Sequence, residues 1–308
     1  MTSKELLWDK VSFSVRHGFW MKSKRILDNI TIEVEKGTVL GLVGPNGAGK
    51  TTTIKLGAGL IMPESGKVLI QKKSAVFSTS RRNLGLLTEA QYFYPHLRLK
   101  EWLKMMAGLS GMTGTDIRKR MDDVLELVEL SSHGDQIMRT LSKGQLQRSG
   151  LAQALLHEPE ILILDEPMSG LDPYWRYKVL NILLEYKKKG GTIAFSSHII
   201  SDVETLSDQV ALLQNGQIVW NGRLKELNRK VEGYKITCYT NALETLEKIA
   251  RENKIEKQPD GGWLFSIDPD KRADFLALVA SNDEIKVESL LPIQEELASV
   301  LFRTTVSP

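Results

Sequence analysis

The chain has a single cysteine among its 308 residues, Cys238, and therefore cannot form an internal disulfide bond. Proteins without disulfides are typical of a reducing compartment such as the cytosol. No apolar run reaches the roughly 18 residues that a membrane-spanning helix requires. The opening stretch MTSKELLWDK also lacks the apolar core of a secretory signal peptide. These absences predict a soluble chain that is not secreted, and they are compatible with a membrane partner.

The chain also has little excess charge of either sign. Its 41 Lys and Arg residues oppose 38 Asp and Glu residues, which leaves a formal net charge of +3. So small an excess does not predict binding to a nucleic-acid backbone. The short basic runs MKSKR and YKKKG are typical of solvated surfaces. Hydrophobic residues make up 42% of the chain, which is ordinary for a folded protein with a substantial core.

Alternation of apolar and polar residues predicts two strands, KVSFSV (10–15) and NITIEVEKG (29–37), with the loop RHGFWMKSKR (16–25) between them. The apolar run TVLGLVG (38–44) predicts a buried parallel strand. After a glycine-rich turn we expect a helix over KTTTIKLGAGLI (50–61) and a strand over GKVLIQ (66–71).

Helical spacing of apolar residues then predicts several helices separated by buried strands. The predicted helices are 99–109, 116–130, 144–156 and 173–190, the predicted strands are 160–166 and 191–198, and a hairpin turns at Asn215-Gly216 before a helix that starts near Leu224. Alternating strands and helices are typical of an α/β fold with a mostly parallel sheet covered on both faces.

The pattern changes near Gly233, where strand, helix, strand, strand, helix and strand follow one another before a final helix over 293–303. The predicted strands include YKITCYT, WLFSI and IKVESL, and the predicted helices ALETLEKIAREN and KRADFLALVAS. This order is that of a ferredoxin-like α+β unit. We therefore predict one domain over residues 1–230 and a small accessory domain over 231–308.

The segment GPNGAGKT matches the pattern G-x-x-x-x-G-K-[ST], with a predicted strand before it and a helix after it. In such a loop the glycines allow backbone N–H groups to surround phosphates, a lysine reaches the β- and γ-phosphates, and a hydroxyl ligates Mg²⁺. The predicted nucleotide-binding residues, which we call the phosphate cradle, are Gly44, Pro45, Asn46, Gly47, Ala48, Gly49, Lys50, Thr51 and Thr52.

Two carboxylates follow the buried strand in ILILDEP, at the strand end where open α/β sheets hold their ligands. Asp165 is suited to holding the metal through a coordinated water, and Glu166 to polarising the water that attacks the γ-phosphate. His198 stands just past the end of GTIAFSSH and is the predicted sensor of the γ-phosphate.

A second phosphate site is predicted where the helix over 144–156 begins, at LSKGQ. Ser142 is suited to the N-cap position and Gly144 allows close backbone approach, while the helix dipole favours an anion. The residues of this segment, which we call the signature segment, are Leu141, Ser142, Lys143, Gly144 and Gln145.

The motifs GPNGAGKTT, LSKGQ, ILILDEP, SGLD and SSH, in this order, closely resemble those of the nucleotide-binding subunit of ATP-binding-cassette (ABC) transporters over about residues 5–230. Ser-x-Gly-Gln shortly before the acidic strand is specific to ABC ATPases, whereas the cradle also occurs in kinases and GTPases. The resemblance implies a P-loop NTPase fold: a RecA-like core, an N-terminal antiparallel β subdomain, and a helical subdomain at about residues 90–155.

The resemblance further implies that ATP and Mg²⁺ are the cofactors and that two copies close head to tail. The signature segment of one copy then binds the γ-phosphate held on the cradle of the other. Asp172 in SGLD matches the loop between the two sites. ATP binding would join the dimer and hydrolysis would release it, a cycle that a membrane partner can use.

Three positions depart from the usual family pattern. Lys143 replaces a glycine that is common in the signature, and Met168 replaces the usual threonine or serine after DEP. The family's glutamine near Mg²⁺ and the attacking water aligns with Glu89 in LLTEAQYFYPHL, with Gln91 as the alternative register. Glu89 is therefore a predicted metal ligand and catalytic residue, together with Thr51 and Asp165 as metal ligands.

Aromatic residues occupy two positions that the resemblance makes functional. Phe19 is the candidate for stacking the adenine ring, with Trp20 as the alternative, and both could equally be packing residues. The segment Tyr92–Leu97 lies where family members form the groove for a permease's coupling helix. Its aromatics could alternatively pack the helical subdomain.

The combined expectation is an ATP-hydrolysing subunit of an exporter-type ABC transporter, bound peripherally to the cytoplasmic face of the cell membrane through a separate permease. The alternatives are a soluble ABC ATPase acting on nucleic acid or the ribosome, a small-molecule kinase, and a catalytically weak binding module. The nearly neutral charge and the absence of a heptad insertion argue against the first alternative. A kinase would leave the signature segment unexplained. The interpretation as a catalytically weak binding module depends on Glu89, which stands in place of the family's glutamine.

Overall fold

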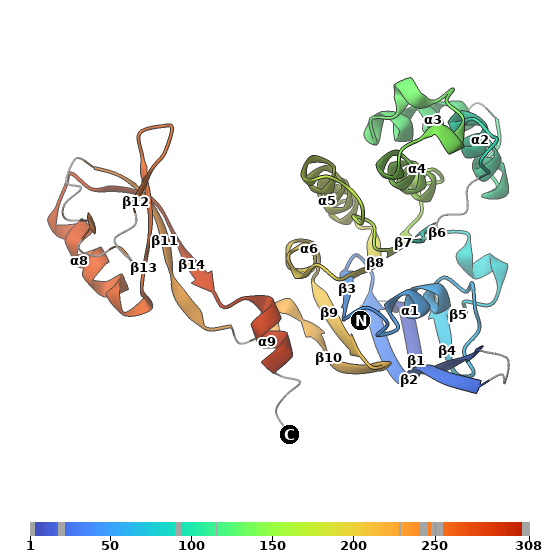
Figure 1. Cartoon of the computed structure of the whole chain (residues 1–308), viewed down its shortest axis with the longest axis horizontal. Coiled ribbons are helices and arrows are strands. Elements are labelled where there is room, and N and C mark those ends of the chain that lie inside the picture. The colour runs from blue at the N-terminus through green and yellow to red at the C-terminus, as the bar shows by residue number, and fades with distance from the viewer. Residues whose placement is uncertain are drawn as a thin grey trace. The chain divides into compact units, whose positions relative to one another are not determined.

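The chain folds into two units, Met1–Glu226 and Leu227–Pro308 (Figure 1). The structure is a computed structural model, and it describes residues 4–17, 22–89, 94–114, 116–227, 229–240, 246–247, 250 and 255–303. The first unit contains two sheets with helices around them, and the second contains one sheet with its own core.

A six-stranded sheet in the order β10-β9-β3-β8-β7-β6 forms the centre of the first unit. Its strands are β3 (Val39–Val43), β6 (Leu84–Leu87), β7 (Ile161–Asp165), β8 (Thr192–Ser197), β9 (Gln209–Gln214) and β10 (Gln217–Arg223). Neighbouring strands run parallel, except that β10 is antiparallel to β9. Every residue of β3, β7 and β8 is buried, which confirms the three predicted buried strands.

The predicted hairpin between β9 and β10 is also confirmed. Asn215 and Gly216 both have positive φ, 49° and 79°. Both central residues of a type I′ turn need this backbone conformation, and Asn-Gly is its preferred sequence. By contrast, the helix predicted to start near Leu224 is a single 3-10 turn, Leu224–Glu226, because the chain enters the next strand only a few residues later.

An antiparallel sheet in the order β2-β1-β4-β5 covers one face of the first unit. Its strands are β1 (Lys4–His17), β2 (Lys22–Glu35), β4 (Ser65–Ile70) and β5 (Lys73–Ser74). The loop predicted over 16–25 is wrong in extent, because β1 and β2 continue into it and pair at Arg16↔Ser23. Arg16, Lys24 and Arg25 lie at exposed strand positions, where basic side chains do not interrupt the ladder of backbone hydrogen bonds.

Helix α1 (Lys50–Gly57) packs between the two sheets (Figure 1). Trp8 of β1 is buried against it and donates a hydrogen bond from Nε1 to the carbonyl oxygen of Thr53 at 3.0 Å. A Cβ on Gly57 would collide with the Trp8 ring, so the helix approaches the sheet closely there. The helix ends at Gly57 and not at the predicted residue 61. The surrounding core includes Leu6, Val11, Leu27, Ile30, Ile32, Leu40, Leu42, Ile54, Ile70, Ile161 and Ile163.

The remaining helices of the first unit lie in two places. Helices α2 (Leu99–Leu109), α3 (Asp116–Leu127) and α4 (Lys143–Leu155) pack on one another as a helical subdomain (Figure 1). Helices α5 (Pro173–Lys188) and α6 (Ile200–Leu206) lie across the six-stranded sheet from α1. The described part of this unit also contains the 3-10 turns Ser78–Arg81, Ser131–His133, Met138–Thr140 and Leu224–Glu226.

The second unit is a four-stranded antiparallel sheet in the order β12-β13-β11-β14. Its elements are β11 (Val231–Tyr239), β12 (Ile255–Lys257), β13 (Trp263–Ile267), a 3-10 turn (Pro269–Lys271), α8 (Arg272–Ser281), β14 (Lys286–Gln294) and α9 (Leu297–Arg303). This is the strand order of a ferredoxin-like fold. Most of the helix predicted over 242–253 lies outside the described residues. Cys238 packs in the core with Phe275, and burial raises the pKa of its thiol to about 11, which makes it unreactive.

No helix within the described ranges is long and apolar enough to cross a membrane.

We predict that Trp8→Ala destabilises the first unit by about 3–5 kcal/mol, because it removes a fully buried ring between β1 and α1. Urea unfolding followed by far-UV circular dichroism measures this cost. Trp220→Ala, at a half-buried position of β10, is the matched control and should cost on the order of 1 kcal/mol. Equal costs for the two variants would contradict the packing role of Trp8.

Candidate functional site

The phosphate cradle is the turn that joins β3 to α1. Gly49 is the N-cap of α1 with φ of 111°, and a Cβ there would lie 2.6 Å from Cδ2 of Leu27. Both the conformation and the packing therefore require glycine. Lys50, 7% exposed, donates from Nζ to the carbonyl oxygens of Gly44 at 2.7 Å and Pro45 at 3.2 Å. The ammonium group is thereby held over the loop, where a phosphate would lie.

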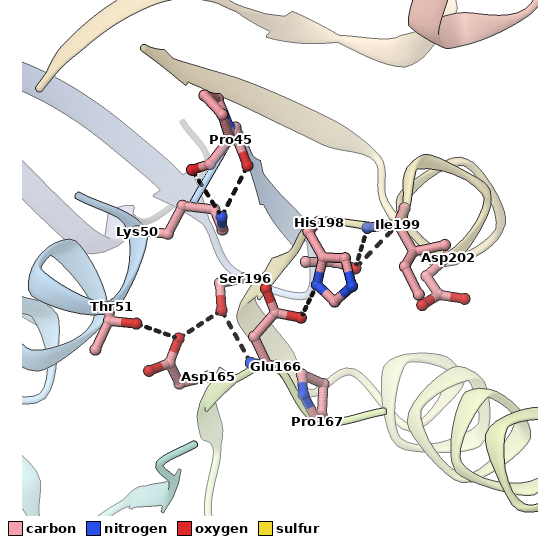
Figure 2. A network of polar contacts seen from close by, with 12 residues as sticks. Pro45, Lys50, Thr51, Asp165, Glu166, Pro167, Ser196, His198, Ile199 and Asp202 are labelled. Atoms are coloured by element: carbon pink, nitrogen blue, oxygen red, sulfur yellow. Dashed lines mark hydrogen bonds and ion pairs between the residues drawn. The ribbon is translucent and has the colours of Figure 1, made fainter. Parts of the chain in front are cut away.

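Asp165 ends β7 next to the cradle and is 1% exposed. Its Oδ1 accepts hydrogen bonds from Thr51 Oγ1 at 3.2 Å and from Ser196 Oγ at 2.6 Å (Figure 2). Its Oδ2 is buried and has no hydrogen-bond partner in the part of the chain that the structure describes. A buried carboxylate oxygen without a partner is energetically costly unless a ligand satisfies it.

Ser196 is a site residue that the sequence argument missed. Its Oγ donates to Asp165 and accepts from the backbone N–H of Glu166 at 2.9 Å. One hydroxyl therefore fixes both members of the acidic pair. The parallel pairing of β7 with β8 puts Ser196 beside Asp165. A single sequence does not reveal which strands are neighbours, so it carried no signal for this contact.

Glu166 and His198 contact each other at the same edge of the sheet. Nδ1 of His198 lies 2.8 Å from Oε2 of Glu166 (Figure 2), and an ionised carboxylate can only accept, so the imidazole donates. The Glu166 side chain is nearly buried, whereas that of His198 is half exposed. Glu166 also has φ of 49°, an unfavourable conformation for a residue with a Cβ. Such strain is commonly found at functional residues.

A cavity of about 590 Å³ adjoins the acidic pair and is lined by Thr51, Glu89 and Asp165, among others. Its lining also includes Gln153, Trp102 and Leu109, which the sequence argument did not single out. Within the described ranges no group of three or more His, Cys, Asp or Glu side chains is arranged to hold a metal. Mg²⁺ is commonly held by only one or two carboxylates together with substrate phosphates. The unpartnered Oδ2 of Asp165 and the Thr51 hydroxyl fit that mode of binding.

The signature segment leads into α4 with Ser142 as N-cap. Ser142 Oγ accepts from the N–H of Gln145 at 3.2 Å, and Gln145 Oε1 accepts from the N–H of Ser142 at 2.8 Å. This reciprocal capping box fixes the start of the helix. The Ser142 hydroxyl is exposed and still has a proton to donate. The segment can therefore present a hydroxyl and a helix N-terminus to an anion.

The other predicted site residues are placed as follows. Asp172 is the N-cap of α5, and its Oδ1 accepts from the N–H of Trp175 at 2.9 Å. Phe19, its alternative Trp20, and Gln91 lie outside the described residues, as do Tyr92 and Phe93 of the predicted permease contact. Tyr94, within that segment, is 57% exposed.

The amino-acid sequence is similar to those of ATP-binding proteins of transporters. A sequence model described as ABC transporter matches residues 27–169. An uncharacterized ABC transporter ATP-binding protein of Nostoc sp. is 41% identical over 267 residues, which cover 86% of this chain and 79% of that protein. The bacitracin transport ATP-binding protein BcrA of Bacillus licheniformis is 34% identical, with 86% and 91% covered.

Among solved structures, the dimeric post-hydrolysis ATP-binding cassette MJ0796 bound to ADP and Pi has a TM-score of 0.66. It covers 71% of this chain and 98% of its own, at 23% identity. At this identity the match establishes the fold of the first unit.

We predict that Lys50→Ala weakens ATP binding by about tenfold to a hundredfold, because it removes a charge-assisted hydrogen bond to phosphate. Isothermal titration calorimetry with ATP measures the affinity. Lys73→Ala, on the exposed strand β5, makes the same change in net charge and should leave the affinity unchanged. An unaltered ATP affinity in Lys50→Ala would show that the cradle is assigned wrongly.

Proposed function

The chain belongs to the family of ATP-binding subunits of ABC transporters, and from this premise we propose that two copies close around two ATP molecules to power export through a separate transmembrane subunit. Membership makes the chain an ABC ATPase that binds ATP. The observation that carries the proposal is the hydrogen-bonded chain Thr51–Asp165–Ser196–Glu166–His198, which connects the nucleotide cradle to a base.

ATP binding is assigned to the cradle. Lys50 and the backbone N–H groups of the turn hold the β- and γ-phosphates. Thr51, Asp165 and Glu89 are the residues that would hold Mg²⁺, as the unpartnered Oδ2 of Asp165 supports. When bound, Mg²⁺ neutralises charge that develops on the phosphate oxygens.

Glu166 is assigned as the group that orients and polarises the attacking water. Ser196 fixes its backbone N–H, and His198 holds its carboxylate from the other side, so the base has little freedom to turn. The His198 side chain remains half exposed, and in the imidazolium form its Nε2 carries a proton that it can donate to a γ-phosphate oxygen. Positioning contributes strongly to phosphoryl transfer, because the protein does little covalent chemistry in it.

The second copy completes each site in this proposal. The hydrogen bonds of Ser142 stay within its own helix end, while the exposed hydroxyl and the N-terminus of α4 are suited to a phosphate held by another chain. The dimeric state of a cassette with the same fold supports this arrangement. Asp172, at the start of α5, is assigned to the loop between the two sites.

The permease contact is assigned to Tyr92–Leu97 and the apolar surface beside it. Tyr94, Leu60 and Leu109 are exposed and line one cavity, with Leu109 at 76% exposure. Exposed large apolar side chains gathered in one place are typical of a protein interface. Similarity to a bacitracin transport protein supports an exporter, and such a subunit would bind at the cytoplasmic face of the cell membrane.

We predict that Glu166→Gln abolishes ATP turnover and allows an ATP-bound dimer to accumulate, because the base is lost while the phosphate contacts remain. Phosphate release and light scattering after size exclusion, with ATP and Mg²⁺, measure the two effects. A variant that stays monomeric at high concentration in ATP would refute the shared-site dimer.

In the same Glu166→Gln background, we predict that Ser142→Asp weakens the ATP-dependent dimer at least about tenfold, since it places a carboxylate against the partner's phosphate. Aspartate is as good an N-cap as serine, so helix α4 should remain intact. Ser142→Asn, which caps without a charge, is the matched control. If the Asp variant dimerises as well as the Asn variant, the signature segment does not bind phosphate.

A further inference from the structure

The segment 166–175 links the base to the loop proposed to lie between the two ATP sites. It begins with Glu166 at the end of β7 and ends in the first turn of α5, where Asp172 caps the helix. Both ends of this linking segment are held by two consecutive side chains of α4, Gln147 and Arg148. Helix α4 is the one that Ser142 caps.

Gln147 holds the first end. Its Nε2 donates to the carbonyl oxygen of Glu166 and to that of Pro167, each at 3.1 Å. These two carbonyls belong to the two consecutive peptides that follow Glu166, which has a positive φ. The two hydrogen bonds therefore restrain the backbone on one side of Glu166, while Ser196 restrains it on the other through the N–H at 2.9 Å.

Arg148 holds the second end. Its guanidinium carbon lies 3.7 Å from the centre of the Trp175 ring, within the range of a cation–π contact. Arg148 is only 9% exposed, and its Nη1 donates to the carbonyl oxygen of Val128 at 2.8 Å. Desolvation lowers the pKa of Arg148, while the carboxylates of Glu129 and Asp172 oppose that shift. The stack thus joins α4, the end of α3 and the start of α5.

The signature segment also packs directly on the middle of the linking segment. A Cβ on Gly170 would lie 3.0 Å from Cε of Lys143, and a Cβ on Gly144 would lie 3.6 Å from Cδ2 of Leu171. Next to the Arg148 stack, Glu129 pairs with Lys178 of α5 at 3.1 Å. The start of α4 and the segment 166–175 therefore contact each other at several points along their length.

We propose that Gln147 and Arg148 are positioning residues that couple the phosphate contact at Ser142 to the placement of Glu166 and Asp172 in the same chain. This inference rests on the proposed function, in which the partner copy's ATP binds Ser142. A helix moves as a rigid body, so a shift of its first turn reaches the Glu166 carbonyl through Gln147 and the start of α5 through Arg148. Phosphate binding at Ser142 therefore acts on the position of Glu166 through contacts that the single chain already makes.

The test uses the full-length protein and three tryptophan variants. Trp175→Leu removes the cation–π partner from a half-buried position, whereas Trp175→Phe retains an aromatic ring. We expect kcat for ATP hydrolysis to fall about tenfold or more in Trp175→Leu, because small misplacements at a reacting centre cost that much. The ATP affinity of the monomer should stay within about twofold, since the cradle is untouched, and Trp175→Phe should recover most of kcat. Trp220→Leu in β10 is the matched control.

An isosteric change tests the other end independently. Gln147→Glu replaces the donating amide with an oxygen that faces two carbonyl oxygens, and should lower kcat with little change in the ATP affinity of the monomer. Wild-type kcat in both Trp175→Leu and Gln147→Glu would overturn the inference while leaving the proposed function intact. Equal losses of kcat and of monomer affinity, with no rescue by Trp175→Phe, would indicate general damage and also overturn it.

A wild-type chain that neither hydrolyses ATP nor dimerises in its presence would overturn the proposed function itself. That outcome is separated from failure of the inference because it appears in the wild type and in Trp220→Leu as well.

Discussion

The candidate site depends on the two hydrogen bonds of Ser196. One oxygen atom donates to Asp165, which contacts the cradle through Thr51, and accepts from the backbone of Glu166. The group suited to hold a metal and the group suited to polarise water are thereby fixed relative to each other in a buried environment. Hydrogen bonds between buried groups are stronger than those in water, and they cost more to leave unmade. The left-handed backbone of Glu166 is sustained by these contacts and by those from Gln147.

The packing of α1 makes this arrangement possible. The helix lies between two sheets, with Trp8 against Gly57 and the turn at Gly49 against Leu27. The cradle therefore emerges from a rigid strand and enters a helix that cannot shift without disturbing the core. Preorganised donors of this kind need no rearrangement when a charged ligand arrives. Much of the rate enhancement at such sites comes from this preorganisation.

In the proposed function, helix α4 is the element through which the site depends on a second copy. Its N-terminus is exposed and capped, while its next turn contacts both ends of the segment that carries Glu166 and Asp172. The exposed end and the buried contacts belong to one rigid element, which is the physical basis of the proposed coupling between phosphate binding and the placement of Glu166. The apolar surface around Tyr94 and Leu109 lies on the same helical subdomain. A membrane partner bound there would act on the helices that carry the signature segment.

Local periodicity in the sequence was enough to determine the α/β class, the buried strands β3, β7 and β8, and the ferredoxin-like order of the second unit. The cradle and the capped helix followed from glycine at special backbone angles and from capping chemistry. From the sequence we missed β6 and α6, which are short and without clear periodicity, and we misjudged where α1 ends and how far β1 and β2 extend. Tertiary structure alone decided that Ser196 bridges the acidic pair and that Arg148 stacks on Trp175. It also decided that one Asp165 oxygen has no hydrogen-bond partner among the described residues. Those contacts join residues distant in the chain, and which strands and helices become neighbours is set by the packing of the whole core.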